Sequence, residues 1–382
     1  MKTDLVVFGE DWGGLPSSTQ HLMRHLAGER RILWVNSIGL RQPRPSLADA
    51  RRALAKLSAR ATRTAVSRPH TERMTMPDGF RVLNPLTLPA PVSRPARALA
   101  SSLLRRQLLP AIREAGLDRP VLWCSLPTAV DVAGQLGERA TVYYCGDDFS
   151  ALAGVDHDTV ATRERELEAK ADLILAASDT LHARFPATKT RLLAHGVDYP
   201  LFANPVPAAS DLPDNGRPLA GFYGSLSEWL DLELLVDVAR RLPHWDFVFI
   251  GAAHVDVSRL DRLDNVYRLG PRPHYELPGY SQHWDVSLLP FRDNAQIRAC
   301  NPLKLTEYLA AGKPVVGTDF PALRRFEPLV SVCPDADSMV RAIEMSLEQA
   351  HDPEHQSRLR QAVANDSWQA RARQVSAWLE DL

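Results

Sequence analysis

The sequence predicts an α/β protein built from two doubly wound parallel-sheet domains. The chain has 382 residues, enough for two domains that each bury a core of their own. Short apolar runs alternate with helical stretches along the chain, which is typical of a parallel sheet covered by helices. A proline-rich stretch from Pro200 to Pro218 interrupts this alternation, and we expect the linker between the domains there.

Apolar runs predict the strands of the first domain. The expected strands are Leu5–Phe8, Arg31–Asn36, Val121–Cys124, Ala140–Cys145 and Leu173–Ala177. Ser17–Leu26 predicts a helix because its apolar residues Leu22 and Leu26 are four positions apart. Four prolines between Asn84 and Pro95 exclude a helix or a central strand, so we expect an ordered connector in that stretch.

The same alternation restarts after the linker. The expected strands are Leu219–Tyr223, Asp246–Ile250, Val266–Leu269, Val286–Leu289 and Val315–Thr318. Asp231–Arg241 predicts a helix between the first two of them. The final stretch, Asp366–Leu382, predicts one amphipathic helix. We therefore expect domains at residues 1–203 and 204–365, followed by a C-terminal helix at 366–382.

Composition and charge limit the class of protein. We expect a cytoplasmic location, because the sequence shows neither a signal-peptide pattern nor a run of about 18 apolar residues. The four cysteines are scattered, which predicts buried free thiols and neither disulfides nor a zinc site. Fifteen Lys and Arg but only three acids lie between Arg41 and Arg113. That basic segment predicts contact with an anionic surface, and the lack of interleaved aromatic residues argues against nucleic acid.

The segment from Asn301 to Asp319 carries the most chemical information. Asn301 and Pro302 predict the start of a helix, with Asn301 as its cap, and Gly312 predicts its end. Lys304 and Glu307 are three positions apart and share a face near that start. A lysine beside a helix N-terminus suits a pyrophosphate, and a carboxylate one turn further suits ribose hydroxyls. A solvated ion pair on an ordinary helix is the alternative that these residues leave open.

The sequence NPLKLTEYLAAGKPVV resembles the donor-site motif of GT-B glycosyltransferases, in the family-4-like group that makes bacterial cell-surface polymers. GFYGSLSEWLDLELL, HWDVSLLPF and the N-terminal GEDWGGLPSSTQHLMRHL resemble further elements of that family in the same order. The resemblance implies two Rossmann-like domains that face a central cleft. It places the acceptor in the first domain and the nucleotide-sugar donor in the second. It also implies that the last helix crosses back to the first domain.

The resemblance implies a role for eight residues. Glu307 would hold the ribose, and Lys304 with the amides after Asn301 would hold the diphosphate. Arg298 would supply a second cation, Gly224 and Ser225 would approach the phosphates, and Arg272 and His274 would lie by the base. The sequence departs from the family at two places. Ala299 replaces a glutamate, and the loop directly after Tyr223 lacks the family's Arg and Lys. These departures leave the donor sugar, and retention or inversion of configuration, open.

An inverting enzyme needs a general base, and two pairs of acids are candidates. Asp147 and Asp148 directly follow an expected strand, at the sheet edge where open α/β proteins bind ligands. Glu10 and Asp11 follow the first strand in the same way. Either pair could instead cap a helix or form a turn. No convincing Asp-x-Asp metal motif occurs, so we expect no metal site and no cofactor besides the donor substrate.

These features predict a glycosyltransferase that moves a sugar from a nucleotide-diphosphate-sugar to a glycan or lipid-linked acceptor, in cell-surface polysaccharide synthesis. A helix between Leu47 and Val66 would place Arg52, Lys56, Arg60 and Arg63 on one side, which favours peripheral contact with the anionic inner face of the plasma membrane. A solvated basic face is the alternative. The competing functions are a non-hydrolysing sugar-nucleotide epimerase and a catalytically silent binding protein of the same fold.

Overall fold

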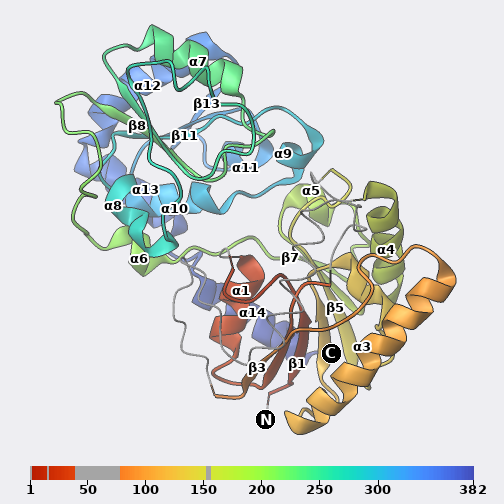
Figure 1. Ribbon diagram of the computed structural model, residues 1–382. Helices are drawn as coiled ribbons and strands as arrows, with labels where there is room; N and C mark the ends of the chain where they lie inside the picture. The colour runs from red at the N-terminus through yellow and green to blue at the C-terminus, as the bar shows by residue number, and fades with distance from the viewer. Residues whose placement is uncertain (1, 15–16, 39–77, 152–155) are drawn as a thin grey trace. The chain divides into compact units, whose positions relative to one another are not determined.

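The computed structural model describes residues 2–14, 17–38, 78–151 and 156–382. The chain divides into two compact units (Figure 1). The first unit comprises Met1–Ala177, Leu181–Leu192 and Ala372–Leu382, and the second comprises Ser178–Thr180 and Leu193–Arg371. Each unit is described by itself below.

A seven-stranded sheet in which every described pair is parallel forms the centre of the first unit, with the order β3-β2-β1-β4-β5-β6-β7. Its strands are β1 (Leu5–Phe8), β2 (Ile32–Val35), β3 (Phe80–Leu83), β4 (Val121–Cys124), β5 (Ala140–Cys145), β6 (Leu173–Ala176) and β7 (Thr190–Leu192). The central strands β1 and β4 are fully buried, because helices cover both faces of a sheet of this kind.

The helical elements around this sheet are α1 (Ser18–Leu26), α3 (Arg94–Glu114), η1 (Pro127–Asp131), α4 (His157–Lys170) and α5 (Asp179–His182). The side chain of Ser17 accepts a hydrogen bond from the amide of Gln20 and caps α1. The last helix, α14 (Trp368–Glu380), contributes its C-terminal part to this unit. Buried Arg30 donates to Ser376 at 2.6 Å, and the Arg191 guanidinium lies 5.3 Å from the Trp378 ring centre. These contacts hold the end of α14 in place.

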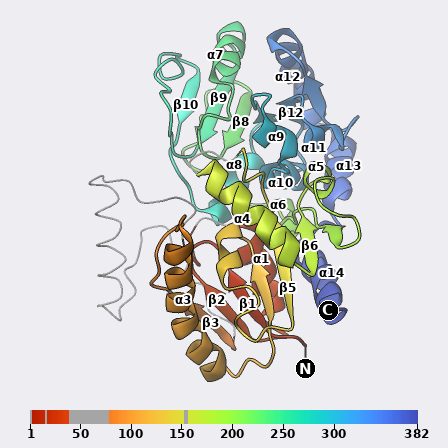
Figure 2. The ribbon, with the colours of Figure 1, turned by 90° about the vertical axis from the view of Figure 1, so that its right-hand side faces the viewer.

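The second unit contains a six-stranded parallel sheet with the order β10-β9-β8-β11-β12-β13, and Figure 2 shows β8, β9 and β10 side by side. Its strands are β8 (Leu219–Tyr223), β9 (Asp246–Ile250), β10 (Val266–Arg268), β11 (Val286–Leu289), β12 (Val315–Thr318) and β13 (Ser331–Cys333). Gly221 on β8 faces the buried ring of Trp284, and a Cβ at Gly221 would lie 1.8 Å from a ring carbon. Only glycine lets the indole pack against this strand.

Helical elements surround the sheet of the second unit, and five of them precede α10, the helix that carries Lys304 and Glu307. The helical elements are α6 (Tyr199–Ala203), α7 (Leu232–Arg241), η2 (His274–Glu276), α8 (Pro278–Ser281), α9 (Ala295–Ala299), α10 (Leu303–Ala311), α11 (Pro321–Arg324), α12 (Ala336–Ala350) and α13 (Pro353–Val363). Helix α10 packs against both α6 and α13. The core of this unit therefore surrounds the helix that carries Lys304 and Glu307.

The prediction of two doubly wound parallel sheets is confirmed. The structure separates the units at Leu192 and Leu193, about ten residues before the expected boundary at 203. The reason is that α6, with Phe202 fully buried, packs on α10 in the second unit. The final helix begins at Trp368, because Ser367 at its start pairs in a bridge with Val197.

Candidate functional site

Helix α10 starts one residue later than the sequence predicts. Pro302 occupies the N-cap position in an extended conformation, with φ −70° and ψ 124°, and makes no side-chain capping hydrogen bond. The prediction that Asn301 is the cap is therefore wrong: the ring of Pro302 fixes φ, and its extended ψ places Leu303 as the first helical residue. The predicted end is confirmed, since Gly312 adopts the left-handed conformation that closes the helix.

Glu307 lies buried in the second unit with both carboxylate oxygens occupied. Its Oε1 lies 2.8 Å from Nε2 of His274, and its Oε2 accepts a hydrogen bond from the Tyr223 hydroxyl at 2.7 Å. The side chain is only 10% exposed, which excludes the alternative of a solvated surface ion pair. A carboxylate has about four acceptor positions, so Glu307 keeps capacity for two more donors.

Tyr223, which binds this carboxylate, is itself held by Tyr308. The amide of Tyr223 donates to the Tyr308 hydroxyl at 3.1 Å, and the two rings meet edge to face with centres 4.8 Å apart. Burial and the negative charge of Glu307 raise the pKa of Tyr223 well above its ordinary value. Tyr223 therefore stays protonated and remains a hydrogen-bond donor to Glu307.

Lys304 lies one turn before Glu307, with its ammonium among aromatic rings. Its Nζ is 4.9 Å from the ring centre of Phe222 and 5.5 Å from that of Phe291. Burial lowers the pKa of Lys304, and the nearby charge of Glu307 partly opposes that shift. Nζ donates no hydrogen bond to any residue in the part of the chain that the structure describes. A cation with unused donors in such surroundings suits an anionic ligand.

Gly224 brings the backbone close to Lys304. It has φ +133°, and a Cβ there would lie 2.8 Å from the Lys304 Nζ. Gly251 approaches in turn, because a Cβ on it would lie 2.0 Å from the Gly224 carbonyl oxygen. Gly224, half-buried Ser225, Lys304 and Glu307 thus come together at the carboxyl end of β8, as the sequence predicts for an α/β ligand site.

Two predicted residues have other partners in this structure. Arg298 is exposed on α9, where it donates two hydrogen bonds to Asp293 at 2.6 and 2.7 Å. Arg272 donates to Tyr280 at 3.0 Å and to Asp211 at 2.5 Å, beside a cavity of about 480 Å³. Of the predicted pair Arg272 and His274, only His274 contacts Glu307. Tyr223 is the site residue that the sequence analysis missed, although its place before Gly224 was a signal.

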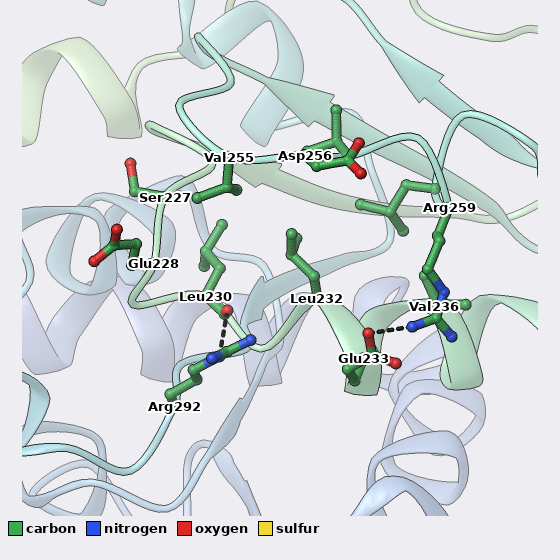
Figure 3. Close-up of a pocket in the computed structure, with 12 residues that line it drawn as sticks. Ser227, Glu228, Leu230, Leu232, Glu233, Val236, Val255, Asp256, Arg259 and Arg292 are labelled. Atoms are coloured by element: carbon green, nitrogen blue, oxygen red, sulfur yellow. Dashed lines mark hydrogen bonds and ion pairs between the residues drawn. The ribbon is translucent and has the colours of Figure 1, made fainter.

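A second cavity, of about 260 Å³, lies next to the loop after β8 (Figure 3). It is lined by this loop, by the start of α7 and by the loop after β9. Nε of Arg292 donates to the Leu230 carbonyl at 3.1 Å, and Arg259 pairs with Glu233. These two arginines are the cations that line the cavity.

The first unit holds the candidate bases. Asp148 accepts hydrogen bonds from Ser150 at 2.5 Å and from Arg184 at 2.6 Å. Burial alone would raise the pKa of Asp148, but these hydrogen bonds outweigh it and leave the pKa below its ordinary value. Asp148 is thus a weak proton acceptor whose position is fixed.

Asp147 is in the opposite situation. Loss of surrounding water and the adjacent Asp148 charge raise the pKa of Asp147 to about 6. Because the residue keeps an exposed surface, we expect the shift in solution to be smaller. No side-chain hydrogen bond of Asp147 is present among the described residues, which leaves its carboxylate available.

Glu10 and Asp11 follow β1. Burial raises the pKa of Glu10, whose carboxylate accepts hydrogen bonds from Ser17 and Gln20 at the start of α1. Asp11 accepts a hydrogen bond from the amide of Ser37 at 3.2 Å. Both acids therefore also stabilise the local loop, as the turn interpretation expects.

The described ranges lack two kinds of feature. They contain no group of three or more His, Cys, Asp and Glu side chains placed to hold a metal ion. They also contain no helix with the length and apolar character needed to cross a membrane. The predicted basic helix at Leu47–Val66, with Arg52, Lys56, Arg60 and Arg63, lies outside the residues that the structure describes.

Known proteins resemble the chain in sequence and in fold. Residues 217–349 match the family model described as glycosyl transferases group 1. TuaH of Bacillus subtilis strain 168, described as a teichuronic acid biosynthesis glycosyltransferase, is 29% identical over 298 residues, covering 72% of this chain and 75% of TuaH.

Two solved structures share the fold over nearly their whole length. Anabaena HepE in complex with UDP is 14% identical, with a TM-score of 0.68 and coverage of 99% of this chain and 100% of HepE. Sucrose-phosphate synthase from Thermosynechococcus elongatus is 16% identical, with a TM-score of 0.70 and coverage of 100% and 99%. At this identity, the likeness concerns the fold.

Proposed function

Because this chain is a glycosyltransferase with the GT-B fold, we propose that it transfers a sugar from a nucleotide-diphosphate-sugar donor to a glycan or lipid-linked acceptor in cell-surface polysaccharide synthesis. The observation that carries the proposal is the arrangement of Lys304, Glu307 and Gly224 in the second unit. It combines a buried carboxylate, a desolvated cation and a glycine whose missing side chain leaves the backbone accessible. The relatives agree with it: the TuaH name refers to teichuronic acid, and HepE structures hold UDP or UDP-glucose.

The donor would bind by the start of α10. The free acceptor positions of Glu307 would receive the two ribose hydroxyls, while His274 and Tyr223 hold its carboxylate in place. Lys304 would donate to the diphosphate, assisted by the amides at the helix start and by the approach of Gly224 and Ser225. His274, beside the ribose position, would lie near the base.

Arg298 and Arg272 would have smaller roles than the family resemblance implies. Arg298 would reach a phosphate only by exchanging Asp293 for it, because both partners are exposed and paired. Arg272 would act by holding the loop before η2, since Asp211 and Tyr280 engage its side chain. Diphosphate neutralisation would then rest mainly on Lys304 and the helix start.

If the reaction inverts configuration, Asp147 is the better candidate for the base. Its carboxylate is available and has a raised pKa, whereas Asp148 is bound by Ser150 and Arg184. Asp148 would then orient the loop, and Asp11 would be the next candidate. We also propose that the leaving diphosphate is stabilised without a metal ion, by Lys304 and the α10 dipole.

We further propose that the protein acts on the cytoplasmic side of an anionic membrane. The support is the charge of the segment Arg41–Arg113, with fifteen Lys and Arg and three acids. Such a contact would bring the first unit to a lipid-linked acceptor.

A screen of nucleotide sugars with the purified protein tests the proposed reaction. Release of nucleoside diphosphate that depends on an added acceptor supports a transferase. Conversion of the donor sugar without acceptor would show an epimerase instead. Tight nucleotide binding without turnover, with every donor and membrane extract offered, would favour a silent binding protein.

A further inference from the structure

The first unit carries a concentrated group of exposed apolar side chains. Among the described residues, seven large apolar side chains are exposed, and five of them lie within 82–99. They are Val82, Leu86, Leu88, Val92 and Leu99. Single exposed apolar residues are ordinary, but a group of this kind marks a surface that contacts something else.

Hydrogen bonds hold the connector that carries Leu86 and Leu88 along α3, which carries Leu99. The connector after β3 lies along α3: the Gln107 side chain bonds both the amide and the carbonyl of Leu86, at 2.9 and 2.8 Å. Thr87 donates to the Ala100 carbonyl at 3.2 Å. Thr87 is half-buried, while Leu86 and Leu88 on either side of it are exposed, as in an extended chain with alternate faces. Their outward side chains therefore lie beside the face of α3 that carries Leu99.

Exposed cations lie on the same helix as part of this apolar strip. The stretch from Arg81 to Arg113 contains six arginines and no acid. Arg94, Arg105 and Arg106 are exposed and form no ion pair within the described part of the chain. Arg106 is seven positions after Leu99, so the two share a face of α3. Arg97, by contrast, is directed inward and pairs with Asp131 and Glu166.

We propose that this connector–α3 surface, formed by Leu86, Leu88, Val92 and Leu99 with Arg94, Arg105 and Arg106, is where the protein docks on an anionic lipid bilayer. The leucines and valine would enter the headgroup region, while the arginines bind phosphate or carboxylate headgroups. The inference rests on the proposed membrane contact, and it assigns that contact to residues of the described fold.

The charge of the surface favours lipid over the chain's own preceding segment as the occupant. Residues 41–77 contain nine Lys and Arg against two acids, so they carry the same sign as Arg94, Arg105 and Arg106. Like charges repel, whereas an anionic leaflet complements both. The two occupants make different predictions, and one experiment separates them.

The experiment is sedimentation of the full chain with phosphatidylcholine vesicles that either contain or lack phosphatidylserine. Wild type should bind only the anionic vesicles, and less at high salt. The variant Arg94→Glu/Arg105→Glu/Arg106→Glu should lower the partition coefficient at least a hundredfold, since each basic residue near the leaflet contributes about fivefold. The variant Leu86→Ser/Val92→Ser/Leu99→Ser should also lose binding, but with little change in salt dependence.

Matched variants elsewhere control for general charge and hydrophobicity. Arg262→Glu/Arg358→Glu/Arg373→Glu reverses three exposed arginines outside the surface, and Met345→Ser removes an apolar side chain that is 67% exposed. Both should bind vesicles like wild type. Nucleotide binding, measured on every variant, should be unchanged, so failure of the transferase proposal would be seen separately from failure of the docking proposal.

Three results would overturn the inference, and the third concerns the leucine variant alone. One is binding of anionic vesicles that survives both surface variants, which would move the contact to another part of the chain. The second is absence of wild-type binding. If the leucine variant unfolds at lower temperature yet binds vesicles normally, the surface packs against the chain itself, and the docking assignment is also wrong.

Discussion

Replacement of Glu307 by alanine tests the proposed donor site most directly. The carboxylate accepts hydrogen bonds from Tyr223 and His274 and has room for two ribose hydroxyls. Loss of a hydrogen bond to a charged group costs about 1–3 kcal/mol. We therefore expect Glu307→Ala to weaken binding of a nucleoside diphosphate by about 5- to 150-fold.

The same substitution affects folding stability, and the two effects need separate measurements. The buried Tyr223 hydroxyl loses its acceptor, which should lower the free energy of unfolding by about 1–3 kcal/mol. Glu307→Gln keeps an acceptor oxygen and most of the side-chain volume, so it should recover stability while retaining part of the binding loss. Glu348→Ala removes an exposed glutamate on α12 and should change neither quantity.

Titration calorimetry of the four proteins with UDP, GDP and ADP measures the affinities, and thermal unfolding measures the stability. Parallel loss of affinity for the diphosphate and for the matching nucleoside would place Glu307 on the ribose. If folded Glu307→Ala binds the preferred diphosphate as tightly as wild type, the ribose assignment is refuted.

Three further predictions follow from the same site and from the first unit. Lys304→Met should weaken diphosphate binding about 10- to 100-fold and leave nucleoside binding nearly unchanged, because the ammonium would face the phosphates in the proposed site; equal loss for both ligands in calorimetry would contradict this role. Turnover should survive a chelator, and activity lost with chelator and restored by magnesium or manganese would reveal a metal site. Asp147→Asn should lower kcat about 100-fold or more if Asp147 is the base. In the wild type, kcat should then fall as the pH drops from about 6 toward the ordinary pKa of an aspartate, because Asp147 becomes protonated in that range, and a flat profile there would exclude it. A raised pKa also means that ionised Asp147 destabilises the fold above that range, so Asp147→Asn should raise the unfolding temperature at neutral pH.

Central strands were predictable, and of the edge strands only β10 (Val266–Arg268) was expected. The bounds of β1, β4, β5, β8, β9, β11 and β12 agree with the prediction, because each is an apolar run ended by polar residues, Gly or Pro. The strands β3, β7 and β13 lie near or at sheet edges and are only partly buried. Their sequences carry little hydrophobic signal, so only the fold reveals them.

The site was predictable where its residues are neighbours in sequence. Lys304 and Glu307 share one helix face, and the spacing alone brings them together. Tyr223 and His274 come from β8 and η2, and their contact with Glu307 depends on how these elements pack around α10. Arg298 has a local partner that the resemblance did not consider, since it pairs with Asp293, five residues earlier, and its role toward a phosphate stays a prediction.

The chain at the start of η2 is held in place by two sets of side-chain contacts, which bears on donor selectivity. His274 contacts Glu307, and Arg272 donates hydrogen bonds to Asp211 and Tyr280. Asp211 belongs to the proline-rich stretch that leads into β8. We therefore expect a substitution at Asp211, outside the site, to remove one hydrogen-bond partner of Arg272 and so to loosen the loop. His274 should then shift as well, because only Pro273 separates it from Arg272. Residues that never touch a nucleotide can in this way alter which nucleotide is preferred.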